Sequence, residues 1–333
     1  MVEGQKNEIR HERVPLEKAV PLPAPFVVHI DPCGACNFTC NFCPCNVSDD
    51  KREERYKLMP LDLFKQIIDD ICTFPEQVKV ICLYAFGEPL LNKDIFEMAR
   101  YIKERQACRE VRIATNGSRL CPEVNQKLVD SGVDLIRISV EALDAQGYQE
   151  VCGYQIDYDR FVDNIRDLHE RGKGRTKVSA KIVNATLKSH EDVERFYSIY
   201  KPITDFTFVE DTLAVWPGFD ECVLPENSTV QSDNWIWKRD HHVRCSSPLT
   251  MLAVHSNGVV SPCAQDWNME IPLGDVHRDK LTDIWRSEKL KQFCLMQLER
   301  NRNQIPVCCN CFCGGSDNID PIADMLAKKL RES

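Results

Sequence analysis

Short apolar segments alternate with amphipathic segments along the first two thirds of this chain. Between the apolar segments, residues such as Phe64, Ile67 and Ile71 recur at helical spacing. Strands joined through helices form a parallel sheet with right-handed crossovers. Since six units are fewer than a closed barrel needs, the pattern predicts an α/β fold with a partial (β/α)6 TIM-like barrel and chemistry at the carboxyl ends of its strands. The expected strands cover 27–30, 78–84, 111–114, 135–140, 177–183 and 206–209.

The amino-acid composition outside these strand–helix units predicts the domain organisation. Residues 1–24 are polar and then proline-rich, so we expect a loose N-terminal arm before a barrel over 25–210. After the sixth strand, Trp, Pro, Asn, Ser and Cys become frequent and helical periodicity fades. We expect a linker over 211–235, a small cysteine-rich C-terminal domain over 236–318 and a C-terminal helix over 319–333.

Charge and apolar patterning restrict the partners of the protein. The net charge of −9 makes phosphate-backbone binding unfavourable. No apolar run is long enough to span a membrane, and the first residues lack the apolar core of a secretory signal. We therefore expect a cytoplasmic protein that binds neither nucleic acid nor a membrane.

Eighteen cysteines in such a chain favour metal or cluster ligation over disulfides. Cys36, Cys40 and Cys43 form a C-x3-C-x2-C segment directly after the first strand. Thiolates hold iron–sulfur clusters, and three of them leave one iron of a four-iron cube open to a small ligand. A zinc site completed by Cys33 or Cys45 is the alternative.

This cysteine loop resembles the signature of the radical S-adenosylmethionine (SAM) superfamily. The resemblance implies that Cys36, Cys40 and Cys43 bind three irons of a [4Fe–4S] cluster and that SAM chelates the fourth. It also implies that an external one-electron reductant, such as flavodoxin or ferredoxin, reduces the cluster. SAM is then cleaved to a 5′-deoxyadenosyl radical that abstracts hydrogen from the substrate. Phe42 matches the family's aromatic residue that packs near adenine.

Three further motifs of this family end the second, third and fourth strands. The first resembles the GGEP motif that contacts the methionine amino group, with Phe86 in place of its first glycine. The other two resemble the polar strand end that reaches the ribose or methionyl group and a Ser-x-Asp segment. The resemblance implies that SAM is bound by Gly87, Glu88, Pro89, Thr115, Asn116, Ser139 and Glu141.

A second group of cysteines resembles the SPASM-type auxiliary-cluster domain. Cys245, Gly258 and Cys263 are spaced as C-x12-G-x4-C, which is similar to the beginning of that domain. The later cysteines of its seven-cysteine form are missing, so the resemblance implies a shortened, SPASM/twitch-like domain with one auxiliary [4Fe–4S] cluster. The best four ligands are Cys245, Cys263, Cys308 and Cys311, and Cys309 or Cys313 could replace one of the last pair. A structural zinc site is the alternative.

The family name leaves the reaction open. SPASM-type relatives act on peptides, on sulfatases, and on sugars or cyclitols. The first strand begins by Phe26, which leaves no room for a leader-peptide-binding domain before it. We therefore expect a small polar substrate, such as a sugar, an aminoglycoside or aminocyclitol, or a nucleoside. A peptide-modifying enzyme and a non-enzymatic cluster- or zinc-binding protein are the alternatives.

Two outcomes at a substrate carbinol are expected, namely dehydrogenation to a ketone and epimerisation. Cys152 lies beyond the fourth strand, where relatives often carry arginine, and is a candidate hydrogen donor for epimerisation. The alternative is that Cys152 is only a small, half-buried loop residue. Glu210 follows the sixth strand and is a candidate to bind hydroxyl or ammonium groups, with a solvated strand end as the alternative.

Overall fold

A computed structural model describes residues 14–46, 50–210, 244–309, 311 and 319–333. Its central element is a sheet of nine strands in the order β6-β5-β4-β3-β2-β1-β7-β8-β9. The strands are β1 (Val27–Ile30), β2 (Val78–Cys82), β3 (Cys108–Thr115), β4 (Leu135–Val140), β5 (Lys177–Val183), β6 (Phe206–Glu210), β7 (Met251–Val254), β8 (Val259–Ser261) and β9 (Gly274–Asp275).

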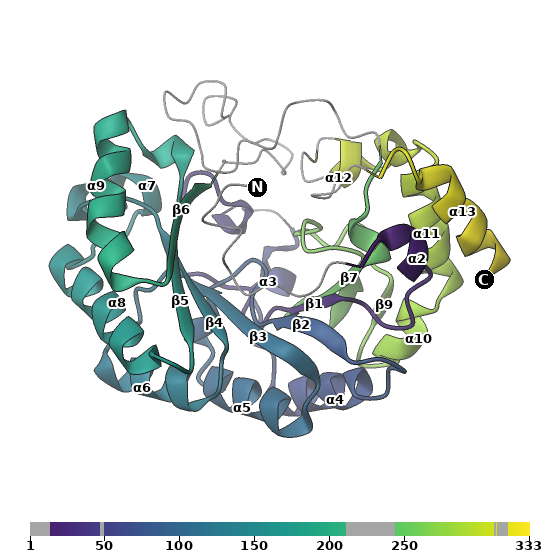
Figure 1. Ribbon diagram of the computed structural model, residues 1–333, viewed down its shortest axis with the longest axis horizontal. Coiled ribbons are helices and arrows are strands. Elements are labelled where there is room, and N and C mark those ends of the chain that lie inside the picture. The colour runs from purple at the N-terminus through teal and green to yellow at the C-terminus, as the bar shows by residue number, and fades with distance from the viewer. Residues whose placement is uncertain (1–13, 47–49, 211–243, 310, 312–318) are drawn as a thin grey trace.

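Strands β1 to β6 are all paired in parallel, in the order of the sequence. They form an open, curved sheet whose outer face is covered by helices (Figure 1). These helices are α4 (Leu61–Ile71), α5 (Ile95–Arg105), α6 (Pro122–Asp130), α8 (Tyr158–Gly172) and α9 (His190–Tyr200). The predicted partial (β/α)6 barrel is therefore confirmed.

Local sequence explains where these helices begin and which face they bury. Helix α9 begins with a capping box, because Ser189 Oγ accepts from the Asp192 N–H (3.2 Å) and Asp192 Oδ2 accepts from the Ser189 N–H (3.1 Å). Helix α4 buries Phe64, Ile67 and Ile71, which share one face, against the sheet. The strands between the helices are largely buried, as parallel strands covered by helices are.

The C-terminal region extends the barrel sheet. Strand β7 pairs in parallel with β1, from Val27 opposite Met251 to Ile30 opposite Val254, and β8 and β9 continue antiparallel. Beyond them lie α10 (Leu281–Trp285), α11 (Glu288–Leu298), α12 (Pro306–Cys309) and α13 (Ala323–Glu332). The sequence predicted the last helix but neither this sheet extension nor α10 and α11. The expected linker, 211–235, lies outside the described residues.

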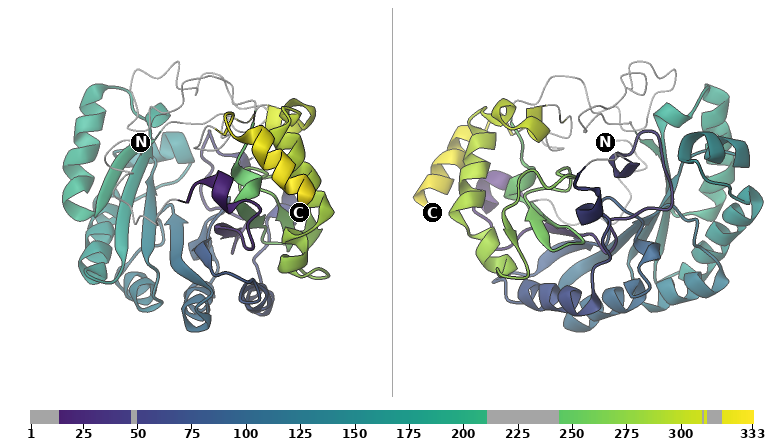
Figure 2. Two further views of the ribbon diagram at one scale, coloured as in Figure 1. Left: turned by 45° about the vertical axis from the view of Figure 1, so that its right-hand side comes forward. Right: turned by 180° about the vertical axis from the view of Figure 1, so that it is seen from behind.

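Residues 14–24 of the expected N-terminal arm are packed rather than loose. They include the short helix α2 (Leu16–Ala19), which lies beside α11 and α13 in two views (Figures 1 and 2). Val20 and Ala24 are buried. The Trp285 indole N–H donates to the Leu22 carbonyl (3.0 Å), and Lys329 Nζ donates to the Glu17 carbonyl (2.5 Å). The arm therefore tethers the barrel to the C-terminal region.

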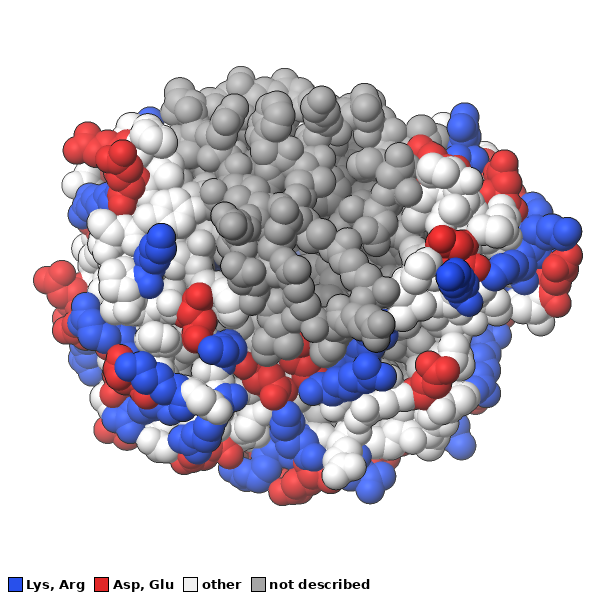
Figure 3. All heavy atoms as spheres, viewed as in Figure 1, with Lys and Arg blue, Asp and Glu red and all other residues white. Residues whose placement is uncertain are grey.

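The surface seen in Figure 3 carries both signs of charge, interspersed around its rim. Several charged side chains pair within one helix, such as Arg171 with Asp167 on α8 (2.7 Å). In the part of the chain that the structure describes, every helix is too short or too polar to cross a membrane.

Candidate active site and auxiliary cluster site

The predicted catalytic cysteines lie on the loop that follows β1, at the carboxyl end of the sheet. The loop is held to the end of helix α7 (Ala145–Cys152) by its backbone. The Thr39 N–H and hydroxyl both donate to the Cys152 carbonyl, at 2.8 and 2.9 Å. Gly153 has a φ of +60°, and a Cβ there would meet Thr39 Oγ1 at 2.4 Å. The glycine therefore permits the close approach that anchors the cysteine loop.

The surroundings of these thiols fit ligands of an iron–sulfur cluster. Cys36 Sγ accepts from the Phe38 N–H (3.4 Å) and from Asn116 Nδ2 (3.7 Å), and such bonds stabilise a thiolate. Burial raises the pKa of the Cys36 thiol to about 12, so the thiol is protonated until a metal binds and displaces the proton. Charge repulsion from Cys43 contributes to the raised pKa of both Cys36 and Cys40, which shows that the three thiols are near one another.

Among the described residues, no three His, Cys, Asp or Glu side chains converge as the ligands of a single metal ion must. The three thiols are instead distributed along the loop. Ligands that each bind a different iron of a cube have no need to meet at one point. The donor set therefore fits a cluster in its residue types and placement.

The predicted SAM-binding motifs that follow β2 and β3 meet at Glu88. Glu88 is buried, and its Oε1 accepts from the Thr115 hydroxyl (2.6 Å) while its Oε2 accepts from the Asn116 N–H (2.7 Å). Burial raises the pKa of Glu88, and these hydrogen bonds oppose the increase. Gly87 packs so tightly on the cysteine loop that a Cβ would lie 1.9 Å from the Cys33 carbonyl oxygen. The structure thus joins the Gly87-Glu88-Pro89 turn, the end of β3 and the cysteine loop.

The ends of β4, β5 and β6 bring together Glu141, Lys181 and Glu210. Lys181 forms an ion pair with Glu210. Burial raises the pKa of Glu141 to about 7, with Lys181 opposing and Glu210 adding to the shift. Burial also raises the pKa of Glu210, but the Lys181 and Arg137 charges outweigh it, so this pKa lies below its usual value. Sequence reasoning missed Lys181, although a lysine near the end of an otherwise apolar strand was a signal.

The remaining predicted residues lie at the same rim. Phe42 is partly buried against the core, and Ser139 lies near the end of β4, opposite Lys181 of β5. Cys152 is fully buried. Its thiol is hydrogen-bonded to that of Cys40, which together with burial raises the pKa of Cys40. Cys152 therefore lies against the cysteine loop, and its role as a hydrogen donor stays a prediction.

Four cysteines of the C-terminal region form one mutually interacting group. Burial raises the pKa of the Cys263 thiol, and the charges of Cys245, Cys311 and Cys308 raise it further. Cys245 and Cys311 affect Cys308 in the same way, and Cys311 affects Cys245. The four thiols, all among the described residues, thus lie in one neighbourhood but do not converge as the ligands of a single metal ion would, which fits four ligands on separate irons of a cube.

The alternatives for this second site are placed differently. Cys309 is exposed, and its thiol donates to the Pro306 carbonyl (3.0 Å). Cys313 lies outside the described residues. Gly258 of the C-x12-G-x4-C pattern forms the turn between β7 and β8 with a φ of +91°. This turn leads the chain back toward Cys263.

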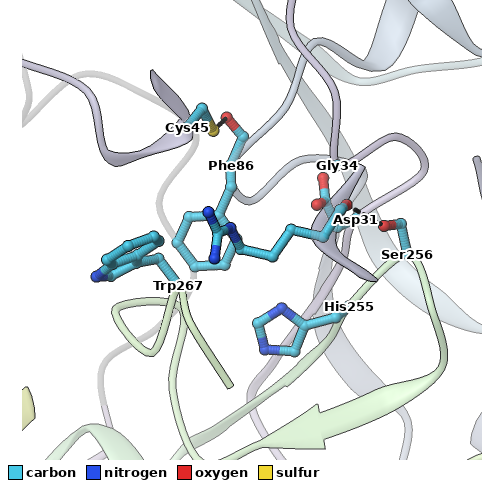
Figure 4. Close-up of a pocket in the computed structure, with 8 residues that line it drawn as sticks. Asp31, Gly34, Cys45, Phe86, His255, Ser256 and Trp267 are labelled. Atoms are coloured by element: carbon cyan, nitrogen blue, oxygen red, sulfur yellow. Dashed lines mark hydrogen bonds between the residues drawn. The ribbon is translucent and has the colours of Figure 1, made fainter. Parts of the chain in front are cut away.

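A small pocket lies between residues of the barrel and residues of the C-terminal region (Figure 4). It is lined by Asp31, Gly34, Cys45, Arg55, Phe86, His255, Ser256 and Trp267. Phe86 stacks on His255 of the C-terminal region, with ring centroids 5.6 Å apart and planes at 9°. The space open to the centre of a water molecule is about 10 Å³, roughly what one ordered water needs. Phe86, the departure from the GGEP motif, is therefore an interdomain packing residue.

Arg55 adds a polar link across this pocket. Its guanidinium lies 4.7 Å from the centroid of the Trp267 ring, and its Nη1 donates to Asn268 Oδ1 (2.6 Å). Its carbonyl oxygen accepts from the Ser256 hydroxyl (3.2 Å). The segment after the catalytic cysteines is thus joined directly to the loop that follows Cys263.

Comparisons with known proteins agree with this arrangement. The family profile described as Radical SAM superfamily matches residues 30–198, and the SPASM iron–sulfur cluster-binding domain matches residues 245–312. The GTP 3′,8-cyclase of Klebsiella pneumoniae subsp. pneumoniae is 25% identical over 168 residues, which are 50% of this chain and 49% of the cyclase. The match therefore spans about half of that relative.

Other relatives cover more of the chain. The SAM-dependent 2-deoxy-scyllo-inosamine dehydrogenase of Niallia circulans is 22% identical over 285 residues, 86% of this chain and 92% of the dehydrogenase. The structure of BtrN with AdoMet and 2-DOIA is similar in fold (TM-score 0.58, 20% identity, 89% of this chain and 97% of BtrN). So is SuiB from Streptococcus suis bound to its precursor peptide SuiA (TM-score 0.62, 19% identity, 83% of this chain and 67% of SuiB).

The matched family regions contain both cysteine groups and the carboxyl ends of β1 to β5. The protein therefore belongs to the radical SAM superfamily, as an enzyme that uses SAM and a [4Fe–4S] cluster and carries an SPASM-type iron–sulfur domain.

Proposed function

We propose that the protein dehydrogenates a carbinol of a small polar substrate of the aminocyclitol or sugar class. The observation that carries this proposal is the group of four mutually interacting thiols, Cys245, Cys263, Cys308 and Cys311. Four cysteines saturate a four-iron cube, so the auxiliary cluster has no site left to chelate substrate and serves electron transfer. The similarity to the 2-deoxy-scyllo-inosamine dehydrogenase over most of both chains supports the same reaction class.

The chain's own residues have separate tasks in this proposal. Cys36, Cys40 and Cys43 hold the catalytic cluster, and the segments joined by Glu88 orient SAM beside it. When bound, these cofactors supply the radical that removes hydrogen from the substrate carbon. Glu210, paired with Lys181 at the ends of β5 and β6, binds a hydroxyl or ammonium group of the substrate and accepts the hydroxyl proton as the carbonyl forms. Phe42, Gly87, Pro89, Asn116, Ser139 and Glu141 remain the proposed SAM contacts.

The test is turnover in deuterated water. The enzyme, reconstituted without oxygen, is given SAM, a reductant and 2-deoxy-scyllo-inosamine or related aminocyclitols and sugars. We expect one 5′-deoxyadenosine for each ketone formed, and no solvent deuterium at the carbinol carbon of the recovered substrate. SAM cleavage without any ketone from the panel would contradict the substrate class.

The variant Cys152→Ala separates dehydrogenation from epimerisation. We expect it to form both 5′-deoxyadenosine and ketone, because Cys152 is buried against Cys40. If wild type instead gives a deuterated epimer and the variant gives none, Cys152 is the hydrogen donor and the enzyme is an epimerase.

Peptide modification is a second candidate, favoured by the similarity in fold to SuiB bound to its precursor peptide. Radical chemistry on a short peptide, with no product from the aminocyclitol panel, would favour it over dehydrogenation.

A further inference from the structure

Two buried polar side chains contact the auxiliary cysteines. Gln297, on the last turn of α11, is 1% exposed, and its Nε2 donates to Cys308 Sγ at 3.5 Å. Arg302, at the start of the following 3-10 turn, is 7% exposed and donates through Nη2 to the Cys311 carbonyl. Each side chain thus brings N–H donors to one of the last two ligands.

Burial of the Gln297 amide lowers the stability of the fold unless the amide is hydrogen-bonded. Its Oε1 has no hydrogen-bond partner among the described residues. A buried amide with an unsatisfied oxygen destabilises a fold relative to a paired one. An apolar residue of similar size would fill the same space without this cost, so the sulfur contact is what the amide provides.

Arg302 places a positive charge among the same thiols. Its guanidinium donates to the Cys311 carbonyl, and the Cys311 N–H donates in turn to the Cys308 carbonyl (3.3 Å). The guanidinium therefore lies beside the backbone segment that carries the last two ligands.

We propose that Gln297 and Arg302 raise the reduction potential of the auxiliary cluster, so that it can accept the electron released by the substrate radical. Reduction adds one negative charge to the cluster. A nearby cation and an N–H···S bond both stabilise this added charge, and charge and hydrogen bonds to sulfur are known determinants of cluster potential.

This inference rests on the dehydrogenation proposed above, in which the electrons balance as follows. The hydroxylated carbon radical loses one electron to the oxidised auxiliary cluster and its hydroxyl proton to Glu210, and a carbonyl forms. The substrate radical is oxidised, and the cluster is reduced by one electron. A higher potential of the acceptor favours this direction.

The test is a redox titration of the reconstituted enzyme, followed by electron paramagnetic resonance. It is repeated in the Cys36→Ala/Cys40→Ala/Cys43→Ala background, in which the auxiliary signal stands alone. We expect Gln297→Leu and Arg302→Gln each to make reduction about tenfold less favourable, a shift of about 59 mV for one electron. Gln297→Glu should shift it further, because it replaces a donor with a negative charge.

Two variants separate the electrostatic role from a structural one. Arg302→Lys keeps the charge and should retain most of the potential. Arg300→Gln removes the same charge from an exposed neighbouring position and should change little. Unchanged potentials in Gln297→Leu and Arg302→Gln, or an equal shift in Arg302→Lys, would overturn the inference. Loss of auxiliary iron from all the variants of these two residues would also overturn it, because their role would then be to hold the ligands.

The potential is measured without substrate, so its outcome is independent of the reaction. If the potentials shift as expected but no ketone forms, the proposed reaction is wrong, while the effect of Gln297 and Arg302 on the reduction potential is supported. If ketone forms and the potentials are unchanged, the reaction stands and the tuning fails.

Discussion

Glu88 is the residue on which the predicted SAM site most depends. Its carboxylate accepts from the Thr115 hydroxyl and from the Asn116 and Leu90 backbone N–H groups, at 2.6, 2.7 and 2.9 Å. Hydrogen bonds to a charged group contribute about 1.5–3 kcal/mol each. The carboxylate therefore fixes the end of β3 relative to the cysteine loop before SAM binds.

We expect Glu88→Gln to weaken SAM binding about tenfold or more, because the new amide nitrogen cannot accept a hydrogen bond. Calorimetric titration of SAM into the reconstituted enzyme measures this. Iron content should be unchanged, since no cysteine is altered. Glu97→Gln makes the same chemical change on the outer helix α5 and should leave the affinity unaffected. Equal affinities in all three proteins would show that Glu88 does not organise the site.

For individual residues, the sequence was informative where only a few residue types can serve a function. Cysteine spacing indicated the candidate ligands of both sites, because few other residues bind iron–sulfur clusters. It could not identify Lys181, Gln297 or Arg302. These types are common on protein surfaces, and their positions at the sites depend on contacts between distant segments.

Among the elements, the β7–β8 turn has the strictest local requirement. Gly258 has a φ of +91°, and a Cβ there would lie 2.5 Å from Cε1 of His277. The turn joins the strand paired with β1 to the strand that leads to Cys263. Its conformation therefore determines where this ligand lies.

We expect Gly258→Ala to lower stability by about 1–2 kcal/mol from the backbone alone, with a further loss from the clash. Thermal melting and iron analysis should show a lower melting temperature and less auxiliary iron. Gly174→Ala is the matched control, because Gly174 has a φ of +77° with no atom within 4 Å of the added carbon. If both variants lose iron equally, the contact with His277 is irrelevant.

Helices and strands were predicted correctly where they depend on the local pattern of apolar residues. The bounds of β1, β4 and β5 agree with the apolar runs of the sequence. Strand β3 begins earlier than expected, at Cys108, because Arg109 and Glu110 interrupt its apolar pattern while β2 still pairs with it. The pairing of β7 with β1 could not be predicted, since it depends on residues far apart in the sequence.

For the whole molecule, the two cysteine groups predict two independent clusters. The wild-type enzyme should hold roughly eight irons, four for each cube. Replacing Cys36, Cys40 and Cys43 with alanine should leave about four irons and abolish SAM cleavage. Iron should remain because the C-terminal thiols form a group separate from the thiols of the cysteine loop. Iron analysis and 5′-deoxyadenosine assays measure both. SAM cleavage by the triple variant, or zinc in place of the remaining iron, would contradict the assignment.

The pairing of β1 with β7 has a consequence during protein synthesis. Strand β1 leaves the ribosome well before its partner β7 does, because Val27 pairs with Met251, which lies much later in the sequence. Until β7 is made, one edge of β1 presents open backbone donors and acceptors, which are a template for wrong pairing. The nascent chain is therefore most vulnerable to aggregation beside its future catalytic loop. Coexpressed chaperones should raise the yield of intact enzyme more than added iron does.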